Sequence, residues 1–195
     1  MVTLSVDWEH IPAKHRSLIK AFLDEADMSA DVIKTVDFPP AYGADIVVSC
    51  EKAKDPKNGS IYLKPTQFVL GIGCRRNTAF ENIDRAIRQS LLKLQIDISD
   101  IDMIASIDVK KDEPGIKEFC ERNRIDFVTY TADELMAVQG EFSASQFVRE
   151  HVGVDNVCER AAVLACSREC NEAGELIYKK HKYDRVTVAA ARYPD

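Results

Sequence analysis

Apolar residues follow two alternating periods from residue 67 onward. Short apolar runs typical of buried strands occur at "QFVLGI", "DMIASIDV" and "DFVTYT". Between them, residues 78–94 and the segment "DEPGIKEFCERN" carry apolar residues every three or four positions, which is the period of an amphipathic helix. Strands that alternate with helices in this way form a parallel sheet with helices on both faces. The pattern therefore predicts an α/β fold.

The pattern then changes to further helices and a closing hairpin. Helical spacing recurs at "TADELMAV", "SASQFVREHVG" and "NVCERAAVLAC". Thr78 with Glu81, and Thr131 with Glu134, have the spacing of capping boxes at helix starts. The last apolar segments, "ELIYKK" and "RVTVAAAR", predict an antiparallel pair of strands. We therefore expect a mixed, mostly parallel sheet with a C-terminal β-hairpin.

A shorter pattern precedes this one. "IPAKHRSLIKAFLDEADMS" has helical spacing with Pro12 near its start, and "DVIKTVDF", "ADIVVSC" and "IYLKP" are predicted strands. We expect two domains, a small leading α/β module at residues 1–66 and a larger α/β domain at residues 67–195.

Composition excludes several classes of function. The 195-residue chain has a net charge of −6, so no overall positive field attracts nucleic acid. No apolar run is long enough to span a membrane, and "MVTLSVDWEH" lacks the regions of a signal peptide. We expect a cytoplasmic protein that binds neither nucleic acid nor membrane.

The cysteines do not indicate a metal site. They form no CxxC pair and have no histidine at ligand spacing: Cys50, Cys74, Cys120, Cys158, Cys166 and Cys170. In a reducing cytosol we expect most of them to be small buried apolar side chains. Only Cys74, beside two arginines and ahead of a helix, stands where a thiolate could be stabilised.

The first loop that could bind a ligand follows the strand "QFVLGI". Gly71 and Gly73 let the backbone turn tightly and approach a ligand, and the next helix start offers unpaired N–H groups. With Cys74, the side chains of Arg75 and Arg76 complete a candidate anion site. A dinucleotide fingerprint is disfavoured, because Arg76 stands where its third glycine belongs. Loop arginines are also commonly just solvated, so the residues alone leave both interpretations open.

The second such loop, "SIDVKKDEPG", follows the next strand. Asp108 and Glu113 stand where a general base would be useful, and Lys110 beside them can keep a carboxylate ionised. The alternative is structural, with Asp112 or Glu113 capping a helix that starts near Pro114. Lys180 belongs to a third basic group, "YKKHKYDR", at the hairpin, where charged residues usually serve solubility.

Four motifs, in this order and spacing, resemble one known family: "GIGCRRNT", "SIDVKKDEPG", "SQFVREHVGVDNVCERAAVLAC" and "RVTVAAAR". They resemble the C-terminal domain of the cobalamin-biosynthesis protein CbiG, a cobalt-precorrin-5A hydrolase, over residues 67–192. The leading module looks like the central segment of that family. A standalone version of the C-terminal domain, the CobE type, is also similar. The chain departs from the family pattern at Asn77, Arg160 and Lys179, where the family usually has glycine, proline and proline, and it lacks room for the N-terminal domain of full-length members.

The resemblance implies a reaction and a substrate. The reaction is opening of the ring-A δ-lactone of a corrinoid, with loss of a two-carbon unit as acetaldehyde. In this interpretation Asp108 or Glu113 is the base, and N–H groups of residues 73–75 stabilise the oxyanion. The cations that would clamp substrate carboxylates are Arg75, Arg76, Lys110 and Lys180. Cobalt arrives with the substrate, so the resemblance implies no cofactor.

Two other classes of function stay open. The chain can be a non-catalytic corrinoid-binding or carrier module that works with a separate partner domain or with other proteins of the cobalamin pathway. It can also be a plain structural or interaction domain. The sequence leaves open whether the chain forms a homodimer.

Overall fold

The computed structural model describes residues 2–27, 33–36, 38, 44–49, 61–63, 65–143, 150, 153–170 and 173–194. The chain divides into two compact units, Met1–Pro65 and Thr66–Pro194, close to the expected domain boundary. Each unit has its own sheet.

The leading unit is a small parallel α/β structure. Its elements are β1 (Val2–Val6), α1 (Ala13–Asp27), β2 (Ile33–Val36), β3 (Ile46–Val48) and β4 (Ile61–Leu63), and its sheet has the order β2-β1-β3-β4. Ile19 and Leu23 of α1 pack on a small core that includes Leu4 and Val6. The strand β1 was not predicted, because polar Thr3 and Ser5 interrupt its apolar run.

The second unit contains a five-stranded mixed sheet. Its elements are β5 (Phe68–Cys74), α2 (Phe80–Leu94), β6 (Ile101–Ile107), α3 (Pro114–Asn123), β7 (Asp126–Tyr130), α4 (Ala132–Ala137), α6 (Val157–Cys170), β8 (Glu175–Lys182) and β9 (Val186–Arg192), with 3-10 turns at Ile98–Asp100 and Asp108–Lys110. The strand order is β7-β6-β5-β9-β8. The strands β5, β6 and β7 are parallel, whereas β9 is antiparallel to β5 and β8 to β9. The predicted mixed sheet and closing hairpin are confirmed.

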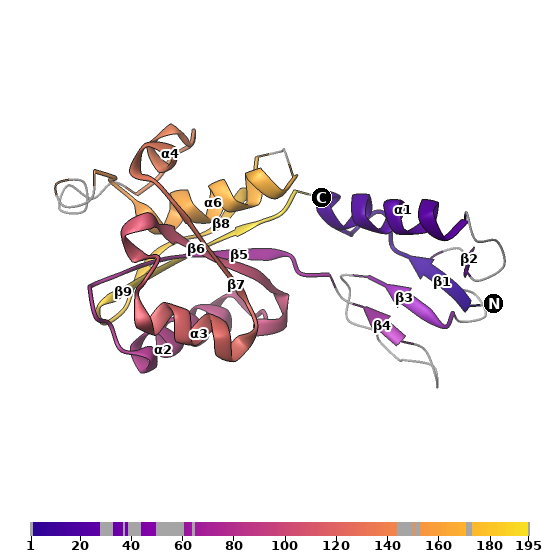
Figure 1. Ribbon diagram of the computed structural model, residues 1–195, viewed down its shortest axis with the longest axis horizontal. Coiled ribbons are helices and arrows are strands. Elements are labelled where there is room, and N and C mark those ends of the chain that lie inside the picture. The colour runs from indigo at the N-terminus through magenta and orange to yellow at the C-terminus, as the bar shows by residue number, and fades with distance from the viewer. Residues whose placement is uncertain are drawn as a thin grey trace. The chain divides into compact units, whose positions relative to one another are not determined.

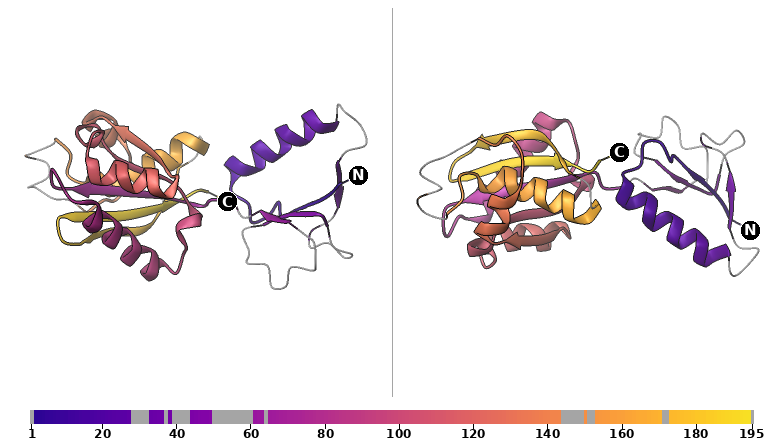
Figure 2. Two further views of the ribbon diagram at one scale, coloured as in Figure 1. Left: turned by 60° about the horizontal axis from the view of Figure 1, so that its bottom comes forward. Right: turned by 90° about the horizontal axis from the view of Figure 1, so that it is seen from above.

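Helices cover both faces of this sheet, as predicted. Figure 1 shows α2 and α3 on one side of the strands and α4 and α6 on the other, and Figure 2 gives two further views. The first face is packed by Ile72, Ile87 and Phe119, among others, and the second by Val69, Ala161 and neighbouring residues. Because side chains alternate along a strand, β5 contributes to both cores. The loops at its carboxyl end are therefore held from both sides.

Of the two predicted capping boxes, one is present in the structure and the other is not. The box at Thr131 is confirmed, since its hydroxyl accepts the Glu134 amide while the Glu134 carboxylate accepts the Thr131 amide. The box at Thr78 is wrong, because α2 begins at Phe80 with Ala79 as its N-cap and no capping side chain. The Thr78 hydroxyl donates instead to the Arg75 carbonyl oxygen, at 2.7 Å. The helix predicted within residues 143–153 falls mainly outside the described residues.

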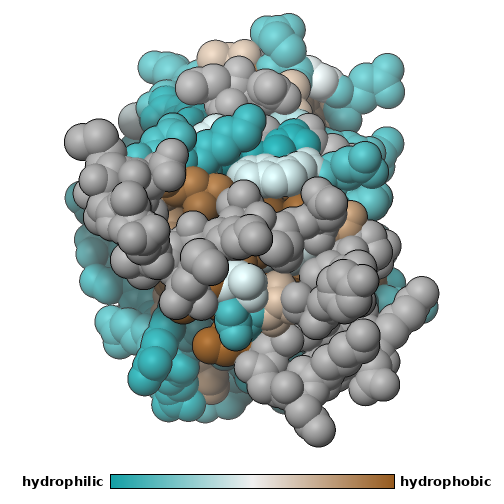
Figure 3. Space-filling view, turned by 90° about the vertical axis from the view of Figure 1, so that its right-hand side faces the viewer, coloured by the Kyte–Doolittle hydropathy of each residue, from teal (hydrophilic) through white to brown (hydrophobic). Residues whose placement is uncertain are grey.

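One face of the molecule is shown in Figure 3. Hydrophilic residues dominate the coloured part of the face in Figure 3, with small hydrophobic areas between them. Among the described residues, no helix has the length and apolarity that crossing a bilayer requires.

Candidate functional site

Three connections meet at one edge of the second unit. The carboxyl ends of β5 and β6 lie side by side in the parallel sheet, and the β8–β9 turn lies beside β5 because β9 pairs with it. The Arg75 amide donates to the Arg185 carbonyl oxygen at 3.0 Å, which fixes the first loop to this turn. In α/β sheets ligands gather at such an edge.

A buried ion pair locks the first loop to the second. Lys110 Nζ lies 3.0 Å from Glu113 Oε2, and the two residues are only 8% and 6% exposed. The other carboxylate oxygen, Oε1, accepts the Thr78 amide at 3.0 Å. Glu113 is the N-cap residue of α3, yet its side chain makes no capping hydrogen bond. Glu113 therefore holds together two loops that are 35 residues apart in sequence.

Asp108 has a different environment. It starts the 3-10 turn directly after β6 and is half-buried, and its carbonyl oxygen accepts the Lys111 amide at 3.0 Å. The structure thus brings Asp108 to the same edge as Arg75 and Arg76, both of which are exposed. Of the two predicted acids, Asp108 is the more accessible to solvent.

The two glycines of β5 leave room for the elements packed beside them, α6 at Gly71 and β9 at Gly73. A Cβ at Gly71 would lie 1.7 Å from the Cys158 carbonyl oxygen, and a Cβ at Gly73 would lie 2.7 Å from Thr187 Oγ1. Gly71 is buried under the helix, so the structure gives it a packing role rather than the predicted approach to a ligand. The Arg75 amide, already bonded to Arg185, is likewise not open for the predicted oxyanion contact.

Cys74 faces the opposite side of β5, toward the core beneath α2 and α3. Burial raises the pKa of the Cys74 thiol to about 11, and the nearby charge of Lys110 offsets this only in part. The side chain is therefore a neutral thiol at neutral pH. The structure argues against the stabilised thiolate considered from the sequence.

Lys180 lies apart from these loops, in a polar cluster beside α6. Its Nζ donates to the Ser143 carbonyl oxygen at 3.1 Å, and its amide donates to Glu159 Oε1 at 2.6 Å. Glu159 is fully buried and also accepts the amide and hydroxyl of Ser143, each at 2.8 Å. The structure therefore joins Lys180 to the anchor of α6 and not to the other predicted cations.

This cluster makes stability depend on pH. Burial opposes ionisation of Glu159, but the hydrogen bonds from Lys180 and Ser143 outweigh it, so the pKa of Glu159 lies below its usual range. A lowered folded-state pKa stabilises the fold above the unfolded value of about 4.3, and this contribution is lost as the pH falls through the folded value. We expect Glu159→Gln to be less stable than wild type at neutral pH, and the gap in unfolding free energy to narrow in acid. Urea titrations at several pH values measure this gap, and a gap independent of pH would contradict the assignment.

Unpaired arginines gather at the loop edge. Several other arginines of the second unit pair with carboxylates: Arg88, Arg122, Arg160, Arg168 and Arg192. Arg85 and Arg124 are exposed and form no such pair within the described residues. Within the described residues, Arg75, Arg76 and Arg185 are exposed and have no ion-pair partner. Arg185 was not among the predicted site residues, since only the pairing of β9 with β5 brings it beside Arg75.

The start of α2 adds to this positive edge. No side chain caps its N-terminus, so its first amides and the helix dipole favour an anion there. Among the residues that the structure describes, no group of three or more His, Cys, Asp or Glu side chains is arranged to hold a metal ion. The arrangement suits an organic anion with several carboxylates.

Comparison with known proteins gives the family. The sequence profile of the family described as "Cobalamin synthesis G C-terminus" matches residues 68–191, more than half of the chain. A relative named "Probable cobalt-precorrin-5A hydrolase" from Methanocaldococcus jannaschii is 31% identical over 137 residues, which are 68% of this chain and 42% of that protein. A cobalt-precorrin-5A hydrolase from Salmonella typhimurium is 37% identical over 102 residues, 52% of this chain and 29% of that protein.

A solved structure matches as well. The crystal structure of CobE, a protein from the cobalamin biosynthetic pathway, is 26% identical with a TM-score of 0.61, and the match covers 64% of this chain and 89% of CobE. The chain spans less than half the length of the two hydrolases above. The profile match includes both loops and the hairpin of the candidate site. The chain therefore belongs to the family of the cobalamin synthesis G C-terminus.

Proposed function

We propose that this protein acts in cobalamin biosynthesis as a hydrolase of cobalt-precorrin-5A, opening the ring-A δ-lactone with loss of acetaldehyde. The observation that carries the proposal is the edge of unpaired arginines inside the region that matches the family. A corrinoid edged with acetate and propionate groups presents carboxylates that these guanidinium groups can bind in forked geometry. A local positive edge also explains how a chain of net charge −6 can hold an acidic substrate.

The two acids take different roles in this proposal. Asp108 is the general base, because its side chain is half-buried at the open edge and can accept a proton from water that attacks the lactone carbonyl. The ring oxygen then leaves as a hydroxyl group on the two-carbon unit. This hydroxyl group loses its proton and becomes the aldehyde carbonyl as the carbon–carbon bond to the macrocycle breaks, and the macrocycle keeps the electron pair of that bond and takes up a proton. Glu113 is a positioning residue, because both of its carboxylate oxygens are engaged within the protein. Lys110 is engaged with it and supports the loop rather than the substrate.

The developing oxyanion needs donors other than the Arg75 amide. The uncapped first turn of α2 supplies amides and the positive end of the helix dipole beside Arg75 and Arg76. Cobalt is part of the substrate, and we propose no resident cofactor. The hydrophilic residues on the coloured part of the face in Figure 3 are in keeping with the cytoplasmic location that we propose.

Acetaldehyde release from cobalt-precorrin-5A by the purified chain tests the reaction. Release supports the proposal. Binding of the compound without release would favour a corrinoid-binding module that works with a partner, and no binding of any corrinoid would favour an interaction domain.

We expect Arg75→Ala/Arg76→Ala to weaken corrinoid binding by about tenfold or more, since each lost charge-assisted hydrogen bond removes roughly 1–2 kcal/mol. Absorbance titration of the corrinoid measures the dissociation constant. Arg124→Ala is the matched control, because Arg124 is exposed but follows α3 at the opposite edge of the sheet. Equal affinities of the double variant and this control would contradict the arginine clamp.

A further inference from the structure

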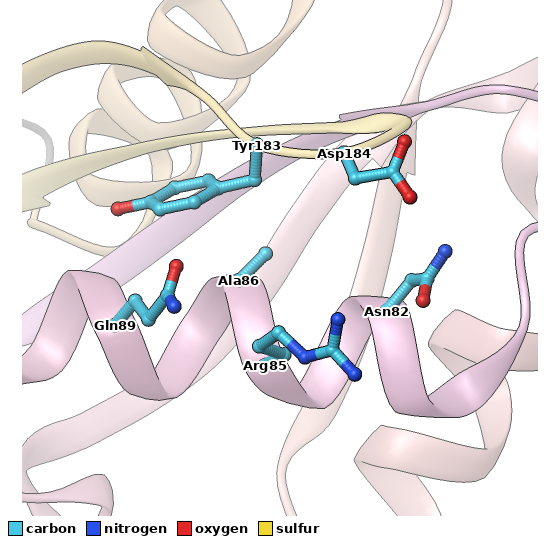
Figure 4. Close-up of a pocket in the computed structure, with 6 residues that line it drawn as sticks. All are labelled: Asn82, Arg85, Ala86, Gln89, Tyr183 and Asp184. Carbon is cyan, nitrogen blue, oxygen red and sulfur yellow. The ribbon is translucent and has the colours of Figure 1, made fainter.

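A cavity of about 220 Å³ lies between α2 and the β8–β9 hairpin. Figure 4 shows Asn82 and Arg85 on the helix and Asp184 on the hairpin around this cavity. The residue after Asp184 is Arg185, whose carbonyl oxygen accepts the Arg75 amide at 3.0 Å. The cavity therefore adjoins the loop that carries the arginines of the candidate site.

The hairpin turn holds Arg185 in an unusual conformation. Its φ is 61°, in the left-handed region that tight turns usually fill with glycine or asparagine. The turn is closed by hydrogen bonds from the Tyr183 amide to the Val186 carbonyl at 2.7 Å and from the Val186 amide to the Tyr183 carbonyl at 3.4 Å.

The charges around the cavity are available to a ligand. Arg85 and Arg185 are both exposed, and neither has an ion-pair partner in the part of the chain that the structure describes. No ion pair there joins Arg85 to Asp184, although both line the cavity. The Arg85 guanidinium and the Asp184 carboxylate thus line the cavity, and Arg185 follows Asp184 in the turn beside it.

We propose that this cavity and Arg185 form a second carboxylate subsite, which places the rim of a poly-acid tetrapyrrole over α2 and the hairpin rather than over α6. The proposal takes its substrate class from the proposed function. Arg85 and Arg185 each bind a rim carboxylate, while Asp184 repels acid groups and limits which side chain enters. Together with Arg75, these contacts fix the orientation of the macrocycle.

Binding of uroporphyrin, a tetrapyrrole edged with acetate and propionate groups, tests the subsite. Fluorescence titration of the full chain compares wild type with Arg85→Ala, Arg185→Ala and Asp184→Asn. We expect each arginine variant to bind about tenfold more weakly, as for the loss of one charged hydrogen bond, and Asp184→Asn to bind more tightly. Arg124→Ala is the control, because Arg124 is also an exposed arginine with positive φ, 56°, and should bind like wild type.

The outcomes separate the subsite from the reaction. Equal affinity of all variants overturns the subsite, and so does a wild-type chain that binds neither uroporphyrin nor cobalt-precorrin-5A. Acetaldehyde release tests the proposed reaction independently of the binding measurements. Release by wild type with normal binding by Arg185→Ala keeps the reaction and rejects the subsite. Weak binding by Arg185→Ala without any release keeps the subsite and rejects the reaction.

Discussion

Asp108→Asn is expected to lower the rate of acetaldehyde release by about 10²–10⁴-fold, the range for loss of a positioned general base. The asparagine keeps the size of the side chain but cannot accept a proton from the attacking water. Affinity for the corrinoid should stay close to that of wild type, because this role is confined to the transition state. Single-turnover release with saturating protein measures the effect on the chemical step.

Asp112→Asn is the matched control for that experiment. Asp112 lies in the same loop and carries the same charge, but its side chain is 75% exposed and pairs loosely with Lys117 at 3.6 Å. Its loss should leave the rate unchanged. Equal slowing in both variants would mean that general loop charge, and not a base at Asp108, controls the reaction. Full activity of Asp108→Asn would remove it from the mechanism.

Breaking the buried pair is expected to destabilise the fold strongly. We expect Lys110→Met alone to lower the free energy of unfolding by about 3–5 kcal/mol, because it leaves the Glu113 carboxylate buried without its counter-charge. The double variant Lys110→Met/Glu113→Gln should recover much of this loss. It carries no buried charge, and the glutamine oxygen can still accept the Thr78 amide. Urea unfolding of wild type, both single variants and the double variant gives the coupling energy.

The same variants distinguish a structural role of Glu113 from a catalytic one. If Glu113 only positions the loops, Glu113→Gln should release acetaldehyde at nearly the wild-type rate per folded molecule. A rate loss as large as that of Asp108→Asn would return the base assignment to Glu113. If the losses in unfolding free energy of the two single variants add up to the loss of the double variant, the two loops are not joined through this pair.

Local pattern was sufficient for the architecture of the second unit. The alternation of apolar runs and helical spacing predicted β5, α2, β6, α3 and β7 in order, because each element satisfies its own period. Thr131 and Glu134 were found for the same reason, since a capping box is complete within four residues. The missed strand β1 shows the limit, as two polar residues hid a strand that lies inside its sheet.

The site depends on contacts that no local pattern encodes. The Glu113 carboxylate accepts the Thr78 amide across 35 residues, a contact that neither the cap predicted for Thr78 nor the predicted role of Glu113 as a base took into account. Arg185 joins Arg75 only because β9 folds back antiparallel onto β5. Lys180 lies in a basic stretch of sequence, yet its contacts with Ser143 and Glu159 tie it to the cluster beside α6. The sequence predicted that the two loops lie at one edge of the sheet, as they do, but it could not say which of their side chains are already engaged.

A crystal structure of this chain with a bound corrinoid tests the central claim most directly. The claim predicts macrocycle carboxylates on Arg75, Arg76 and Arg185, with the ring-A side within reach of Asp108. A corrinoid bound over α6 beside Lys180, with the arginine edge left in solvent, would contradict it.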